Sequence, residues 1–201
     1  MAAWTERAEL LFKKEGLEKL KNANVLIVGV GGVGSFAAEF IARAGVGKMT
    51  IVDGDVVDIT NINRQLPALH STVGMPKIDV VGDCLMDINP ELLSPERAFE
   101  IITPEYDYVM DCIDSLTPKL NLITAAKRKR VKIISSMGAG GKMEAAKVKV
   151  ADISNTVNCF MAKAMKKKLK AVKIDKLKVV FSSEIQDDSS MKMTDGSNFN
   201  K

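Results

Sequence analysis

At 201 residues with 46% hydrophobic side chains, the chain is long enough for one sizeable core and short for two, so we expect one domain spanning residues 1–201. No stretch approaches the roughly 20 uninterrupted apolar residues of a membrane span. The amino terminus also lacks the layout of a secretory signal, and together these absences predict a cytoplasmic protein that does not contact a membrane. Three scattered cysteines, Cys84, Cys112 and Cys159, form no C-x-x-C pair, which argues against a disulfide framework or a structural zinc site.

The net charge of +4 is unevenly distributed along the chain. Residues 1–100 hold 10 Lys and Arg against 14 Asp and Glu, whereas residues 101–201 hold 19 against 11. This excess points to a polyanionic partner for the C-terminal half, although a solvated lysine-rich face is the commoner reason for such a pattern.

The first elements in chain order are two short helices, near 5–12 and 15–21. The apolar, β-branched run at 24–30 is typical of a buried parallel strand. A helix at 35–44 and a strand at 48–53 follow, and together they form one βαβ unit of a helix-covered parallel sheet.

The alternation of strands and helices continues through the middle of the chain. We expect a helix near 76–87, a strand at 108–112, a helix near 118–130 and a strand at 131–136. This order predicts an α/β fold with a Rossmann-like, doubly wound, mostly parallel sheet.

The pattern changes after Gly138-Ala-Gly-Gly141. Polar and apolar residues alternate at 146–151, a basic amphipathic helix is expected at 161–171, and a strand is expected at 178–182. An antiparallel C-terminal extension is the expected result. Residues 187–201 are polar and are expected to form a loop.

A glycine-rich loop, Gly29-Val-Gly-Gly-Val-Gly34, lies between the first strand and its helix. Glycines at this place let the backbone approach a phosphate and direct helix N–H groups at it. Asp53 ends the next strand, where a carboxylate can accept hydrogen bonds from ribose hydroxyls. The pattern predicts an adenine nucleotide but leaves NAD, FAD, S-adenosyl donors and ATP open.

Three further segments narrow this choice: residues 53–65, residues 73–77 and Asp111-Cys-Ile-Asp-Ser115. Their order and spacing after the glycine loop resemble the ubiquitin-activating-enzyme-like superfamily, which includes the sulfur-carrier adenylating enzymes. The resemblance implies that ATP, and not NAD, lies over the glycine loop. It assigns the ATP site to Gly29, Gly31, Gly32, Gly34, Asp53, Asp55, Asn61, Asn63, Arg64, Gln65, Lys77, Asp114 and Ser115.

The same resemblance implies a role for the charged members of this set. Asp53 would hold the ribose, while Arg64 and Lys77 would offset the charge that builds up as pyrophosphate leaves. Asp114 would bind Mg²⁺ near the α-phosphate. Displacement at phosphorus needs such cations and a metal, and not an acid–base pair. Arg7 resembles an N-terminal arginine that dimeric members contribute to the partner's site, although a helix-surface arginine is an equally good interpretation.

Within the superfamily, the sequence looks most like the tRNA threonylcarbamoyladenosine dehydratases. The segments that carry this likeness are 113–119, 136–142, 150–156 and 181–184, and the two C-x-x-C pairs usual in sulfur-carrier adenylating enzymes are absent. The likeness implies activation of the threonyl carboxylate of a modified adenosine at tRNA position 37, followed by cyclisation with loss of water. It also implies a homodimer and leaves open sulfur-relay proteins as partners.

A tRNA substrate would give the basic residues a purpose, because RNA phosphates need a positive surface. The candidates are Lys127, Arg128, Lys129 and Arg130, with Lys166, Lys167 and Lys168. A solvated helix face is the alternative for each of them.

The sequence departs from the family pattern at three places. The segment between Pro90 and Tyr106 is short, Asn158 and Cys159 stand where Asp-Pro is common, and the family continues past Lys201. An adenylyltransferase for a small carrier protein ending in Gly-Gly is the alternative enzyme. An NAD-dependent oxidoreductase and a non-catalytic nucleotide-binding scaffold are further alternatives, but the oxidoreductase gives no reason for Asn61, Arg64 and Lys77.

Overall fold

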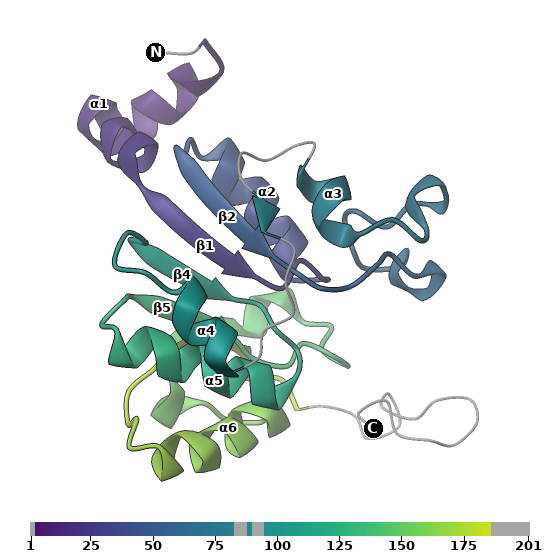
Figure 1. Cartoon of the computed structure of the whole chain (residues 1–201), viewed down its shortest axis with the longest axis vertical. Coiled ribbons are helices and arrows are strands. Elements are labelled where there is room, and N and C mark those ends of the chain that lie inside the picture. Colours follow the sequence, from purple (N-terminus) through teal and green to yellow (C-terminus); the bar gives the residue numbers. More distant parts are fainter. Residues whose placement is uncertain (1–2, 83–87, 90–94, 186–201) are drawn as a thin grey trace. The chain divides into compact units, whose positions relative to one another are not determined.

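The structure is a computed structural model, and it describes residues 3–82, 88–89 and 95–185. The chain divides into two compact units, Met1–Ile133 and Ile134–Lys201. Figure 1 shows the elements of both units along the chain. Among the described residues, no helix is long and apolar enough to cross a membrane.

The first unit contains a parallel sheet with the strand order β3-β2-β1-β4. Its strands are β1 (Asn24–Val28), β2 (Lys48–Val52), β3 (Ile88–Asn89) and β4 (Tyr108–Asp111). Its helices are α1 (Glu6–Asn22), α2 (Gly34–Arg43), α3 (Lys77–Gly82), α4 (Pro95–Ile101) and α5 (Leu116–Arg128). In the register, Leu26 of β1 stands between Thr50 of β2 and Val109 of β4.

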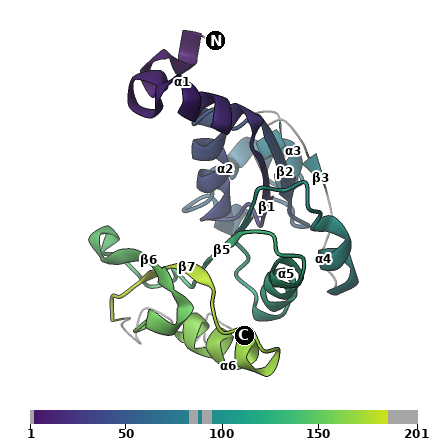
Figure 2. The ribbon, with the colours of Figure 1, turned by 90° about the vertical axis from the view of Figure 1, so that its left-hand side faces the viewer.

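Helices cover both faces of this sheet, as a doubly wound fold requires. Ala38 of α2 and Ile78 of α3 share one core cluster with Ile27 and Ile51 of the strands. In Figure 2, α2 lies on one side of β1, and α4 and α5 lie together on the other. Burial on both faces explains why β1 is a continuous apolar run, in which Leu26 and Ile27 are fully buried.

The second unit contains three strands in the order β5-β7-β6. They are β5 (Ile133–Ser136), β6 (Val148–Asp152) and β7 (Lys178–Ser182), and α6 (Phe160–Ala171) lies between β6 and β7 in the chain. β5 pairs with β7 in parallel, whereas β6 pairs with β7 antiparallel. The predicted fold class, Rossmann-like with a mostly parallel sheet and an antiparallel C-terminal extension, is therefore confirmed.

Most element boundaries differ from the predictions by a few residues, for local reasons. Strand β1 ends at Val28 because Gly29 turns away with φ = +88°. Helix α5 begins at Leu116 and includes Pro118, which is tolerated in a first turn because its missing N–H would be unpaired there. The two predicted N-terminal helices are confirmed: element α1 contains two helical stretches that are separated by a non-helical residue, Lys13 (φ = 60°, ψ = 169°).

Two elements were not predicted, the short strand β3 and helix α4. β3 lies just before the short segment between Pro90 and Tyr106, and α4 lies within that segment. Of the predicted helix at 76–87, α3 covers Lys77–Gly82, and residues 83–87 lie outside the described part. The predicted loop at 187–201 also lies outside it.

Candidate active site at the carboxyl edge of the first sheet

The glycine loop joins the carboxyl end of β1 to the start of α2. Gly29 donates its N–H to the Val52 carbonyl at 2.8 Å, so the loop is tied to the end of the neighbouring strand β2. A methyl group on Gly34 would lie 1.7 Å from the Gly29 carbonyl oxygen, a distance that no side chain can meet. Glycine at position 34 therefore lets the first turn of α2 close directly onto the loop.

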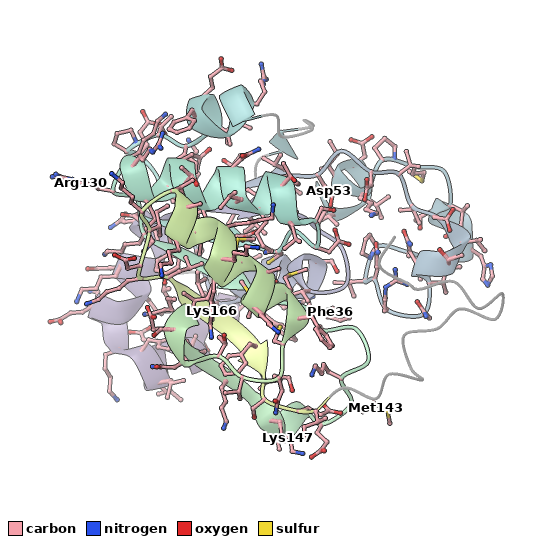
Figure 3. The ribbon with its side chains drawn as sticks, turned by 90° about the horizontal axis from the view of Figure 1, so that it is seen from below. Phe36, Asp53, Arg130, Met143, Lys147 and Lys166 are labelled. Atoms are coloured by element: carbon pink, nitrogen blue, oxygen red, sulfur yellow. The ribbon has the colours of Figure 1, made fainter. Side chains whose placement is uncertain are left out.

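Asp53 holds the glycine loop from the end of β2. One carboxylate oxygen accepts the Val30 N–H at 2.7 Å and the other accepts the Asp55 N–H at 2.9 Å. Figure 3 marks the position of Asp53 at this edge. Each oxygen keeps a second lone pair, so the side chain can still accept hydrogen bonds from a ligand.

Residues 53–77 leave the sheet as one long excursion that is closed at its base. Val57 donates to the Met75 carbonyl and Gly74 donates to the Val57 carbonyl, both at 2.8 Å. Lys77 Nζ lies 2.8 Å from Asp55 Oδ2, and the Lys77 side chain is only 6% exposed. Lys77 is therefore a buried cation at the base of the excursion and not a solvated first-turn lysine. Its ammonium has three donors, so the pairing with Asp55 leaves capacity for another anion.

Asn61 lies at the end of a short turn, Ile59–Asn61, inside the excursion. The Asp58 carboxylate accepts hydrogen bonds from the Thr60 side chain and backbone, which lower the pKa of Asp58 in that order of importance. The side chain of Asn61 is buried, and its Oδ1 accepts a hydrogen bond from the Asp58 N–H at 3.1 Å. The two residues fix the turn that leads into Asn63, Arg64 and Gln65.

Arg64 and Gln65 face the glycine loop. A methyl group on Gly32 would lie 3.3 Å from the Arg64 carbonyl oxygen and 3.5 Å from its Cγ, so the stem of Arg64 lies along the loop. The guanidinium donates to the Thr60 carbonyl and to Asn63 Oδ1, both at 2.9 Å, and remains exposed.

Gln65 is buried beside Gly31. A methyl group on Gly31 would meet the Gln65 amide nitrogen at 3.7 Å, an ordinary contact distance. The Gln65 Oε1 atom is buried and accepts no hydrogen bond from the described residues. Buried acceptors are rarely left unpaired, and this one points to a hydroxyl, amine or water that completes the site.

The loop after β4 forms the other wall. Cys112 donates its N–H to the Val28 carbonyl at 2.9 Å, and a methyl group on Gly29 would lie 3.0 Å from the Cys112 backbone. Asp114 and Ser115 follow and are exposed, with the Ser115 hydroxyl 3.2 Å from Asp114 Oδ1. The glycine loop, Asp53, Arg64, Gln65 and this loop thus meet at one edge of the first sheet.

A buried ion pair, which was not among the predicted site residues, supports this wall. Lys119 Nζ lies 2.8 Å from Asp111 Oδ2, and both side chains are fully buried. The second Asp111 oxygen accepts the Ile113 N–H at 3.1 Å. The sequence does carry a signal for the pair, because Asp111 ends an apolar strand and Lys119 occupies an otherwise apolar face of α5.

Cys112 lies within this loop but is not activated. Burial is the main cause that raises the pKa of the Cys112 thiol to about 12, and the neighbouring Asp111 carboxylate adds to the rise. The Lys119 ammonium lowers this pKa and offsets only part of the rise. The thiol therefore stays protonated near neutral pH and is a poor nucleophile.

The remaining predicted residues lie away from the glycine loop or have other contacts. Arg7 is exposed on α1. Lys129 donates to the carbonyl oxygens of Phe99 and Ile102 at the end of α4, and Arg128 lies over the Phe99 ring at 5.9 Å. Two of the four basic residues at 127–130 thus fasten α4 to α5, whereas Arg130 extends outward from the ribbon in Figure 3.

The basic residues of α6 belong to the second unit and divide in a similar way. Lys166 donates to the carbonyl oxygens of Thr156 and Ser154 at 2.9 and 3.2 Å, whereas Lys167 and Lys168 are exposed.

The departure from the family pattern at Asn158 and Cys159 has a local explanation in the second unit. Asn158 adopts φ = +52°, which Asn tolerates better than most residues, and its side chain donates to the Ser183 carbonyl at 2.9 Å. Cys159 stands at the N-cap of α6, and its sulfur accepts the Ala162 N–H at 3.5 Å.

Comparison with known proteins agrees with this geometry. The chain matches the ThiF family over residues 5–180. The tRNA threonylcarbamoyladenosine dehydratase of Bacillus subtilis (strain 168) is 46% identical over 187 residues, which cover 89% of this chain and 74% of that protein. The molybdopterin-synthase adenylyltransferase of Escherichia coli (strain K12) is 36% identical over 140 residues, covering 66% of this chain and 55% of that protein.

A solved structure shares both the fold and the sequence signal. The crystal structure of E. coli tRNA N6-threonylcarbamoyladenosine dehydratase in complex with ATP superimposes with a TM-score of 0.86 at 30% identity, covering 92% of this chain and 84% of that one. The chain therefore belongs to the ThiF family and, within it, to the group of the tRNA threonylcarbamoyladenosine dehydratases.

Proposed function

We propose that this chain is an ATP-dependent tRNA threonylcarbamoyladenosine dehydratase. It would adenylate the threonyl carboxylate of the modified adenosine at tRNA position 37 and promote cyclisation of that side chain with loss of water. The observation that carries the proposal is the meeting of the glycine loop, Asp53, Arg64 and Gln65 at one edge of the sheet. The relative solved with ATP bound supports it.

The residues around the glycine loop fit an ATP molecule. Gly31 leaves space for a ligand to approach the backbone, and the unpaired Gln65 Oε1 beside it offers an acceptor for a hydroxyl or amine. Asp53 retains lone pairs for ribose hydroxyls. The first N–H groups of α2 would face the phosphates, where the helix dipole favours negative charge.

Cations and one carboxylate supply the remaining requirements for displacement at phosphorus. The exposed Arg64 guanidinium and the buried Lys77 ammonium would stabilise the departing pyrophosphate. Asp114 is exposed and suits Mg²⁺, which proteins commonly hold through one or two carboxylates plus substrate phosphates. Bound there, Mg²⁺ would neutralise charge on the α-phosphate.

The reaction then follows from atom balance. A threonyl carboxylate oxygen attacks the α-phosphorus, and the bond to the bridging pyrophosphate oxygen breaks, which yields an acyl-adenylate. A nucleophile within the same side chain next displaces AMP and closes the ring. The oxygen lost from the carboxylate leaves with AMP, so ATP removes one equivalent of water. Because its pKa is about 12, the Cys112 thiol is not suited to form a covalent intermediate.

The assembly and location are also proposals. Trp4, Leu10 and Leu11 of the N-terminal segment are 63%, 76% and 74% exposed, and Phe40 of α2 is 68% exposed. Such apolar exposure supports a homodimer in which Arg7 reaches the partner's nucleotide. A tRNA substrate places the enzyme in the cytoplasm, and exposed Lys167, Lys168 and Arg130 would contact its phosphates.

The decisive experiment measures AMP release by the purified full chain with ATP, Mg²⁺ and threonylcarbamoyl-modified tRNA. Matched reactions contain unmodified tRNA or a carrier protein ending in Gly-Gly, because the molybdopterin-synthase adenylyltransferase relative keeps that alternative open. AMP release should require the modified tRNA. Asp114→Ala and Arg64→Ala should each reduce the rate by roughly a hundredfold or more, the usual cost of removing a preorganised charge. AMP release with the carrier protein alone would reject the proposal.

A further inference from the structure

A cavity of about 440 Å³ opens in the second unit, at the amino end of α6. Its lining combines an aromatic ring, Phe160, with two ammonium groups, Lys163 and Lys166. The described lining residues include no carboxylate. The catalytic residues proposed above all belong to the first unit, so none of them lines this cavity.

The aromatic ring is available to a ligand. Phe160 is 67% exposed although it is a large apolar side chain, and the neighbouring Val157 is 53% exposed. An exposed aromatic face beside positive charge is the usual platform on which proteins stack single-stranded nucleobases. Aliphatic side chains do not stack on bases in this way, so replacing the ring with an aliphatic side chain tests its role.

The charges around the ring are arranged for an anion. Lys163 is exposed one helical turn after Phe160. Lys166 is held at the wall by the carbonyl oxygens of Thr156 and Ser154, so its ammonium is already ordered before a ligand arrives. The nearby Asp152 carboxylate is occupied by the N–H groups of Ser154 and Leu177 at 2.9 and 3.1 Å.

Hydrogen bonds hold the backbone that carries the ring. Asn158 is tied to the Ser183 carbonyl through its side chain, and its own carbonyl accepts a hydrogen bond from Lys142 at 2.9 Å. Cys159 then caps α6, whose first residue is Phe160. These hydrogen bonds position the backbone from which the Phe160 side chain extends.

We propose that this cavity binds an unpaired nucleotide of the tRNA substrate, with its base stacked on Phe160 and its phosphate between Lys163 and Lys166. The inference rests on the proposed function. RNA-binding proteins recognise bases in loops in this way, because the bases there are free to unstack. The positive charge of residues 101–201 complements the RNA backbone.

The test compares two changes of the ring with one control variant in the full chain. Phe160→Leu keeps most of the apolar area but removes the stacking face, whereas Phe160→Tyr keeps the face. We expect Phe160→Leu to weaken tRNA binding about tenfold and Phe160→Tyr to stay within about twofold of wild type. Met143→Ala, which removes an apolar side chain that is 91% exposed in the same unit, is the matched control and should have no effect.

The charge contacts are tested separately. Lys163→Ser should reduce the slope of log affinity against log salt by about one, the value for one neutralised phosphate. Lys48→Ser, which removes an exposed lysine of the first unit, is its control and should leave the slope unchanged. ATP affinity should be unaffected in every variant. A blunt RNA duplex of equal length should bind wild type and Phe160→Leu equally.

The outcomes separate this inference from the proposed function. If the wild type neither binds tRNA nor releases AMP with the modified tRNA, the proposed function fails. If the wild type does both and Phe160→Leu binds as tightly as wild type, this inference is overturned. Equal loss for Leu and Tyr, or a change in molecular mass by light scattering for Phe160→Leu, would also overturn it, because the ring would then support packing or a second copy.

Discussion

Replacing Lys119 with Met should destabilise the first unit strongly. Its ammonium lies 2.8 Å from Asp111 Oδ2, and both side chains are fully buried. Removing one partner of such a pair leaves a charge uncompensated in the interior, which typically costs about 3–5 kcal/mol. Asp111 keeps the Ile113 N–H as a donor, so we expect the lower part of that range.

Urea unfolding at pH 7, followed by circular dichroism, measures this cost. With a urea m value of about 2 kcal/mol/M, a loss of about 3–4 kcal/mol moves the midpoint down by about 1.5–2 M. The double variant Asp111→Asn, Lys119→Met should recover part of the loss, because both charges of this pair are then removed and Asn can still accept the Ile113 N–H. Glu39→Gln, in the exposed Glu39–Arg43 pair of the same unit, should cost less than about 1 kcal/mol.

Two results would refute this reasoning. A Lys119→Met variant that unfolds within about 1 kcal/mol of wild type would mean that the pair is hydrated or easily rearranged. A double variant as unstable as the sum of both singles would mean that the two side chains do not stabilise one another.

Three further predictions follow from the site and its surroundings. Gly31→Ala should fold normally, because the nearest atom to its methyl group would lie at 3.7 Å, yet it should bind ATP more weakly by calorimetry, and normal ATP binding would count against the proposed pose. Gly34→Ala should also lower the melting temperature, because its methyl group would lie 1.7 Å from a carbonyl oxygen. Cys112 should resist iodoacetamide at pH 8 in the folded chain and react after unfolding, since its pKa is raised to about 12. The same shift predicts that the free energy of unfolding falls as pH rises above about 9, where the thiol of the unfolded chain ionises first. Rapid alkylation of the native chain would contradict both predictions. Backbone N–H groups, first that of Glu144, lower the pKa of Glu184. The contribution of Glu184 to stability is therefore present above its pKa in the unfolded chain and is lost as pH falls through its pKa in the folded chain. Glu184→Gln should flatten the acid side of the curve of stability against pH, and an unchanged curve would exclude this role.

The sequence predicted the first sheet well because its signals are local. Strand β1 is a continuous apolar run, whereas helix α2 has apolar residues at helical spacing, and the glycine loop separates the two. Each element is therefore specified by its own residues. Strand β7 was predicted with the boundaries that the structure shows, because its run is apolar and short. β3 was missed because two residues carry no period, and its pairing with β2 is a tertiary contact.

In the candidate site, too, the features set by local sequence were predictable and those set by tertiary contacts were not. Glycines and Asp53 are predictable because backbone approach and strand ends impose residue types on fixed positions. The burial of Lys77 was not predictable, because it depends on Asp55 reaching back across the base of the excursion. The sequence also could not show which basic residues form hydrogen bonds within the protein and which are exposed. Lys129 and Lys166 donate to carbonyl oxygens of other segments, and nothing in a run of lysines shows which of them has such a partner.

The closed base of the excursion has a consequence for local dynamics. Three backbone hydrogen bonds and one ion pair close the base, and they join Val57, Gly74, Met75, Asp55 and Lys77. The residues between them pair mainly among themselves. Such a segment opens as one cooperative unit when its base opens, so its amides should share one protection factor in hydrogen exchange. Arg64 and Gln65 lie inside this unit. Formation of the proposed nucleotide-binding surface is therefore linked to a single local opening equilibrium. Any ligand that contacts both sides of the base should slow exchange across the whole segment.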